Sequence, residues 1–191
     1  MIDCGKISKN LILASCKASS PAIEPEVILV NFDDWKAAEK TITEGVLSAL
    51  TLGEAANGYK YESHKNSLET DCTLSKGTYV NTFDHKVTFR VFSKTQTIKD
   101  EINKLANGRV VAITKNANVP EEDGVKYEVF GADNGLEMSE SSAPSSGTDG
   151  VIYSFSLASG DNAKESALPL TIDAGDVEAT DALVESLIKA A

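Results

Sequence analysis

The run His85-Lys86-Val87-Thr88-Phe89-Arg90-Val91-Phe92 decides the fold class of this 191-residue chain. From His85 onward, apolar or aromatic residues alternate with their neighbours, a two-residue period that is typical of a strand with one buried face. A second β-prone run, Val110-Val111-Ala112-Ile113, leads into a polar stretch that contains Pro120, as a strand entering a loop does. These runs predict a protein built mainly of β-strands.

Between these two strands the hydrophobic period changes to that of a helix. Ile98, Ile102 and Leu105 fall on one helical face, and charged or polar residues occupy the other face. Thr97 can cap the first turn, and Gly108 follows the last turn. We therefore predict one internal helix over residues 97–107.

Further strands are expected wherever short β-prone runs are bounded by turn residues. Leu168–Ile172 contains Pro169 and is expected to lie at a sheet edge, because proline cannot donate a hydrogen bond to a central ladder. The other expected strands are Leu11–Cys16, Val27–Val30, Tyr59–Glu62 and Val151–Leu157. Polar or proline-containing segments at residues 18–26, 64–72 and 140–150 are expected to be surface loops.

Residues 34–50 admit two interpretations. Trp35, Ala38, Ile42, Val46 and Leu50 fit a helical face, but the β-branched residues and Gly45 also fit extended structure. We follow the extended interpretation and place a strand at residues 45–52.

The C-terminal residues carry a helical stripe of Leu183, Val184, Leu187 and Ile188, which predicts a short helix over residues 180–190. The expected fold is a single domain spanning residues 1–191. It is an antiparallel β-sandwich or small barrel with an N-terminal arm, long surface loops, one internal helix and a short C-terminal helix.

Composition and charge narrow the classes of function. The chain has 29 acidic and 18 basic residues and a formal net charge of −11, which disfavours stable binding to a nucleic-acid backbone. No apolar run is long enough to span a bilayer, so we expect no membrane partner. Cys4, Cys16 and Cys72 are widely spaced and form no Cys-x-x-Cys pair, which argues against a zinc knuckle or a disulfide framework.

Catalytic and cofactor-binding motifs are missing from the sequence. The two histidines, His64 and His85, have no second ligand at metal-binding spacing. There is no nucleophile elbow or phosphate loop, and Gly131-Ala132-Asp133-Asn134-Gly135 reads as a turn because no helix follows it. We expect no catalytic residue, no metal and no cofactor, and we do not expect an enzyme.

The order of these segments resembles the tail tube proteins of tailed bacteriophages, especially those of phages with Bacteroides-type hosts. The resemblance covers the middle of the chain. It rests on the His85-x-Val87-x-Phe89 strand, the helix with its trailing glycine, the Val110–Ile113 strand and the phrase Tyr127-Glu128-Val129-Phe130-Gly131 before Gly135-Leu136. The phrases Asn31-Phe32-Asp33-Asp34 and Val151–Leu157 also resemble that pattern.

The resemblance implies a structural protein of the virion tail that is assembled in the host cytoplasm. Subunits would join into rings, expected to be hexameric, which stack with other tail proteins into a channel that DNA crosses without specific binding. An acidic channel wall would repel phosphate. We expect subunit contacts in the N-terminal arm, the loop at residues 64–72 and the C-terminal helix. The named residues are His64, Leu68, Leu183, Leu187 and Ile188.

One alternative comes from a different class of protein. Leu13-Ala14-Ser15-Cys16 has the form of a lipoprotein cleavage box, with Lys6 and Lys9 upstream. The chain would then be a surface or periplasmic binding module anchored at Cys16. Against this interpretation, the apolar core of the segment is short and Asp3 lies in what should be a positive region.

Overall fold

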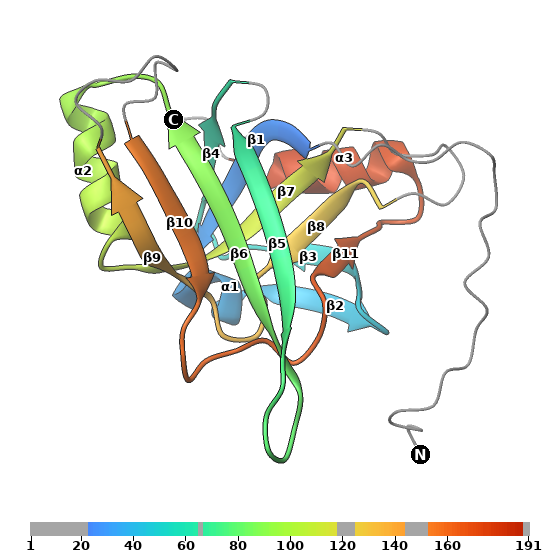
Figure 1. Ribbon diagram of the computed structural model, residues 1–191. Helices are drawn as coiled ribbons and strands as arrows, with labels where there is room; N and C mark the ends of the chain where they lie inside the picture. The colour runs from blue at the N-terminus through green and yellow to red at the C-terminus, as the bar shows by residue number, and fades with distance from the viewer. Residues whose placement is uncertain (1–22, 65–66, 118–124, 144–152, 189–191) are drawn as a thin grey trace, which may run out of the picture.

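The computed structural model describes residues 23–64, 67–117, 125–143 and 153–188 (Figure 1). The elements in chain order are β1 (Ile23–Asn31), α1 (Phe32–Ala37), β2 (Glu39–Thr43), β3 (Val46–Thr51), β4 (Gly58–Glu62), β5 (Leu68–Ser75), β6 (Thr82–Val91), α2 (Gln96–Leu105), β7 (Arg109–Asn116), β8 (Tyr127–Phe130), β9 (Leu136–Ser142), β10 (Tyr153–Ser159), β11 (Leu170–Ile172) and α3 (Val177–Ser186). The strands follow the order β2-β3-β11-β8-β7-β9-β10-β6-β5, and β1 joins β7 to β4. The prediction of a mainly β protein is confirmed.

This hydrogen-bonded sheet folds into two facing layers. β7 pairs with β8 along one stretch and with β9 along the next, so the chain between β8 and β9 turns a corner. Val27 and Leu29 of β1 then share a buried cluster with Val87 and Phe89 of β6, although β1 and β6 are not hydrogen-bonded neighbours. We call β9, β10, β6 and β5 the front sheet, which crosses the other strands in Figure 1.

The strand β7 is buried on both faces, which makes it the centre of the molecule. Val110 and Ala112 point into the cluster between the two layers, whereas Val111 and Ile113 belong to a second cluster. That second cluster also contains Val184 of α3, so the helix forms a third layer behind β7 and β1. A continuous apolar run is what a strand with two buried faces requires.

Both predicted helices are present, with shifted ends. α2 begins after Thr95, whose side-chain oxygen accepts a hydrogen bond from the Ile98 N–H at 3.3 Å, so Thr95 and not Thr97 is the cap. α3 begins earlier than expected, after Asp176, whose carboxylate accepts the Ala179 N–H at 2.7 Å. The first residue of each helix is set by its capping side chain, and the hydrophobic stripe alone does not locate it.

Residues 34–50 combine a short helix with a hairpin. The short helix α1 was not predicted, and the helical interpretation fails beyond it because Ala38 is already extended. Glu44 and Gly45 adopt positive φ angles of 50° and 84° and make the turn between β2 and β3. β3 confirms the strand expected at residues 45–52.

The loop predicted at residues 64–72 is wrong. β5 starts at Leu68 and pairs with β6 along its whole length, from Leu68–Phe89 to Ser75–Thr82. Its polar residues Glu69 and Asp71 lie on the outer face of the front sheet. A strand of this kind has little hydrophobic signal, because its partner strand supplies most of the buried surface.

Three further predictions about strand position need correction. β1 already begins at Ile23, so residues 23–26 are not loop, although the pairing register shifts between Ile23 and Val27. β11 is not an edge strand: it pairs with β8 antiparallel and with β3 parallel, and Pro169 lies just before it. The sheet is therefore mixed. β9 extends to Ser142, so the loop expected from residue 140 begins later.

The strand predicted at residues 11–16, and with it Cys4 and Cys16, lies outside the described residues, as do parts of the three predicted loops. The described helices lack the length and apolar character needed to span a membrane.

Candidate assembly surfaces

His85 is a buried structural residue. Its side chain is 1% exposed and lies at the interface between β6 and the turn after β8. Nδ1 accepts the Gly131 N–H at 3.2 Å, so Nε2 carries the proton and donates to the Ala167 carbonyl at 3.0 Å. Burial lowers the pKa of this histidine, which keeps it neutral with both ring nitrogens occupied.

Glu165 holds the same turn from the other side. Its carboxylate is buried and accepts the backbone N–H groups of Asp133 at 2.7 Å and Asn134 at 3.0 Å. Its own main chain exchanges two hydrogen bonds with Phe83 of β6, at 2.8 and 2.9 Å. Burial raises the pKa of Glu165, and the two N–H donors oppose that rise.

The predicted turn at residues 131–135 is thereby confirmed as the corner between the two layers. Its polar groups are engaged in fixing the backbone, and the described residues contain no cluster of side chains that could hold a metal ion. The second histidine, His64, is exposed and packs edge-on against Phe92, with ring centroids 4.7 Å apart.

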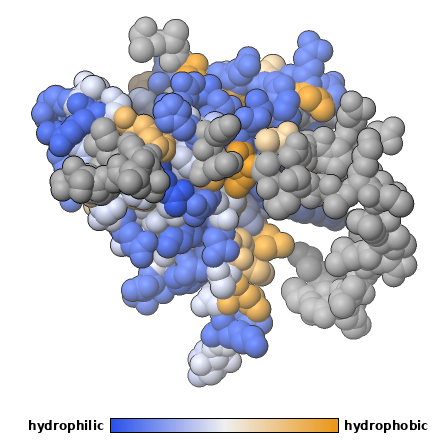
Figure 2. All heavy atoms as spheres, turned by 45° about the horizontal axis from the view of Figure 1, so that its top comes forward, coloured by the Kyte–Doolittle hydropathy of each residue, from blue (hydrophilic) through white to orange (hydrophobic). Residues whose placement is uncertain are grey.

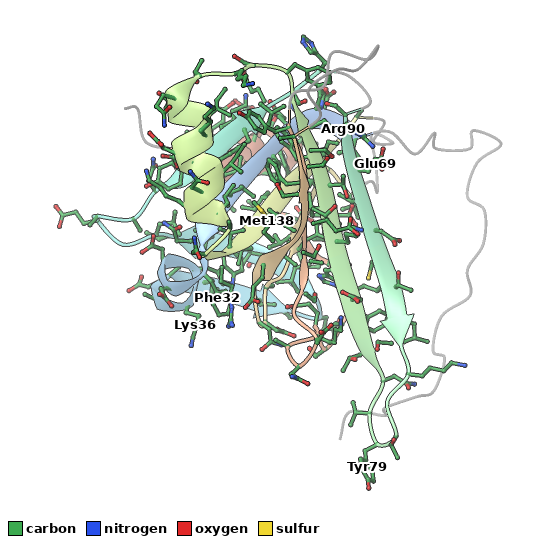
Figure 3. All side chains as sticks on the ribbon, turned by 60° about the vertical axis from the view of Figure 1, so that its left-hand side comes forward. Phe32, Lys36, Glu69, Tyr79, Arg90 and Met138 are labelled. Carbon is green, nitrogen blue, oxygen red and sulfur yellow. The ribbon has the colours of Figure 1, made fainter. Side chains whose placement is uncertain are left out.

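The most prominent surface feature is the hairpin of β5 and β6. Residues 76–81 form its tip, which extends beyond the body of the protein (Figures 1 and 3). Tyr79 is 96% exposed, Val80 70% and Leu74 47%. Figure 2 shows apolar surface on this projecting part. An exposed tyrosine beside an exposed valine on a protruding element makes the tip a candidate contact surface.

The outer face of the front sheet is polar, and its lysine and arginine side chains are paired with carboxylates. Thr88 and Ser156 meet across β6 and β10 with their hydroxyl oxygens 2.9 Å apart. The ion pairs on this face and its margin are Arg90–Glu69 at 2.7 Å, Lys86–Glu140 at 3.3 Å, Arg109–Glu137 at 2.8 Å and Lys164–Asp84 at 2.6 Å. Figure 3 shows Arg90 and Glu69 side by side. The face is therefore close to neutral rather than strongly acidic.

The five residues predicted to make subunit contacts have different environments. Leu187 is 2% exposed and Leu68 6% exposed, and both belong to the cores of the single chain. Leu183 and Ile188 are half-buried beside the second cluster, and His64 is exposed. A charge at Leu187 would disrupt the fold itself, so this residue cannot report on assembly.

Sequence reasoning missed the hairpin tip and the anchoring role of Glu165. The tip lies between two strands, one of which was read as a loop, so its projection could not be inferred. Glu165 sits in a polar stretch, and only the fold brings it to the N–H groups of the corner. The one usable signal was the glycine-flanked turn, whose exposed donors need an acceptor.

Comparison with known proteins does not identify a family. No protein-family model matches the chain, and no curated protein or solved structure matches it.

Proposed function

We propose that this protein is the repeating subunit of a phage tail tube, in which copies join into rings, the rings stack, and DNA passes through the central channel. The order of sequence segments described above supports this proposal. The two-layer β fold with a helix between β6 and β7 is compatible with it.

The observation that carries the proposal is the projecting hairpin. Tyr79 and Val80 stand at the far end of two paired strands, and the described part of the chain leaves them exposed. Burying a side chain of this size stabilises a complex by roughly 1.5–3 kcal/mol. A second copy of the chain is the simplest partner that would supply the covering surface in every subunit of an assembly.

The strand edges are the second supporting feature. Among the described residues, β5 at one end of the strand order pairs only with β6, and β2 at the other end pairs only with β3. Unpaired edges favour addition of a further strand, and closing sheets around a ring satisfies them without aggregation.

The front sheet is the face that we assign to the channel wall. Its cations Arg90, Lys86 and Lys164 are already engaged by carboxylates. A phosphate passing such a wall finds few free cations, and stable DNA binding depends on neutralising phosphates with free Lys and Arg. Charge pairing, rather than a large acidic excess, would let DNA slide.

The test is assembly of the purified chain as a function of concentration. Light scattering gives the mass, and negative-stain electron microscopy shows whether the particles are rings or tubes with a central hole. The variant Tyr79→Ser/Val80→Ser should raise the concentration needed for rings to stack into tubes at least a hundredfold, since about 3 kcal/mol of burial is removed. A wild-type chain that stays monomeric throughout the series would contradict the proposal.

A further inference from the structure

An apolar groove lies at the end of the molecule opposite the hairpin tip. It encloses about 670 Å³ between β4 and α2 and is closed below by the end of β6. Tyr59, Tyr61, Val91, Ile98, Ile102 and Ile188 supply its apolar lining. Tyr59 is 49% exposed, and Ile98 and Ile102 are only half-buried.

The described residues leave two sides of the groove incompletely covered. α2 is strongly amphipathic, yet Leu105 is its only buried residue, so the apolar side chains of its first turns lack a full packing partner. Amphipathic helices ordinarily bury this face against a core. The apolar patches at this end of the molecule, which Figure 2 brings forward, are the matching surface feature.

The other open side is the backbone edge of β4. The Gly58 N–H donates to the Leu187 carbonyl at 2.8 Å and therefore points away from β1. By strand alternation the main-chain groups of Lys60 and Glu62 point the same way. Within the described part of the chain β4 pairs only with β1. The groove can therefore provide a partner with both backbone hydrogen bonds, from the edge of β4, and apolar contacts, from its lining.

The groove and the tip occupy opposite ends of one element. β6 leaves the hairpin tip at Thr82 and reaches the groove at Val91, a span of about 30 Å for an extended strand. Figure 1 shows the hairpin pointing away from the end that carries β4 and α2. Because the tip protrudes at one end and the groove lies at the other, the tip of one copy can meet the groove of the next when the copies are stacked along one axis.

We propose that the hairpin tip of one copy docks in the groove between β4 and α2 of the next copy, with Tyr79 and Val80 against the apolar lining. This inference rests on the proposed function, because it names the surface that receives the hairpin between stacked rings. The charges do not oppose the pairing: the tip carries Lys76, and the groove carboxylates Glu62 and Glu101 are paired with Lys60 at 3.0 Å and with Lys104 at 2.5 Å.

A contact of this kind is heterologous, since two different surfaces of the same chain meet. Such contacts propagate without limit unless the rotation closes them, and along an axis they produce a stack. Each contact is small. A ring makes several of them at once, so stacking is tight only after rings have formed.

Two full-length variants test the inference. Val80→Lys places a charge on the apolar tip and leaves the groove unchanged, whereas Ile98→Glu places a charge in the groove and leaves the tip unchanged. Each alone should raise the concentration for stacking at least tenfold relative to wild type in light scattering. An equimolar mixture should form only pairs of the smallest assembled unit, because each pair then uses the one intact tip surface and the one intact groove surface.

Controls separate this inference from loss of the fold and from the proposed function. Circular dichroism checks folding, Tyr59→Ser is a second groove variant on a different element, and Leu168→Lys alters an exposed apolar residue outside both surfaces and should stack like wild type.

Three outcomes would overturn the inference in different ways. If Ile98→Glu and Tyr59→Ser stack at the wild-type concentration, the groove is not the docking site, but the proposed self-assembly is unaffected. Loss of stacking on removal of residues 1–22, with Val80→Lys unaffected, makes the N-terminal segment the occupant. A monomeric wild type removes both the inference and the proposed function.

Discussion

Replacing Gly135 by alanine tests the corner that joins the two layers. Gly135 has a φ of +78°, and an added Cβ would lie 2.4 Å from Cγ of Arg109 and 2.9 Å from Cδ2 of Phe32. A left-handed conformation costs an alanine about 1–2 kcal/mol. Forcing an extra carbon into a packed site costs about 1–3 kcal/mol more. We expect the free energy of unfolding to fall by roughly 2–5 kcal/mol.

Moving the Arg109 side chain away from the added Cβ would break existing contacts. Arg109 would have to leave the Glu137 carboxylate, which is 2.8 Å away, and its position over the ring of Phe32, 5.4 Å from the centroid. Gly45→Ala is the matched control, because Gly45 has a φ of +84° and an added Cβ there meets nothing within 4 Å. It should lose only the conformational part, about 1–2 kcal/mol. Urea unfolding with linear extrapolation measures both. Equal losses for the two alanine variants would refute the account of the corner.

Three other predictions concern pH, the second core and the channel wall. Burial lowers the pKa of His85 in the folded protein, so below pH 6.5, the ordinary histidine pKa, the unfolded chain binds a proton that the folded protein does not. The contribution of neutral His85 to the free energy of unfolding should therefore be complete above pH 6.5 and decrease below it. That loss, at most about 1.4 kcal/mol per pH unit, should be smaller in His85→Gln when urea unfolding is repeated at each pH, and an equal loss in this variant would exclude His85 as its source. Leu187→Ala should lower the unfolding free energy by about 2–5 kcal/mol in the same assay, and a loss under 1 kcal/mol would place Leu187 outside the core. Glu69→Lys with Asp71→Lys should convert tubes that pass DNA into tubes that retain it at low salt, in a filter-binding assay, with retention falling as salt rises; unchanged retention would remove the front sheet from the channel.

Much of the fold could be predicted from local pattern. β6 alternates strictly because one of its faces meets the other layer and the other face meets solvent. α2 could be recognised from its hydrophobic period and its trailing glycine, although its cap is Thr95 and not the predicted Thr97. β7 was identified as a strand from a continuous apolar run, although the run did not reveal that two separate clusters bury it.

The missed elements are those whose stability comes from a distant partner. β5 has a weak pattern of its own and is a strand because β6 pairs with it along its full length. β11 was expected as a strand, but its place inside the sheet was missed, because the flanking β3 and β8 are far apart in sequence. Helix α1 is held by Trp35, whose indole N–H donates to the Ala132 carbonyl at 2.9 Å, a contact that local sequence does not encode.

The sequence by itself determined the β class of the protein, its internal helix, its turn at residues 131–135 and its lack of recognisable catalytic motifs, because each follows from the spacing of neighbouring residues. Only the tertiary structure decided which apolar residues remain exposed. Leu187 was expected to contact a neighbouring subunit but is buried in the second cluster, whereas Tyr79 was not singled out and is carried by the hairpin beyond the body of the protein. Burial depends on which distant segments pack together, and that is a property of the whole chain.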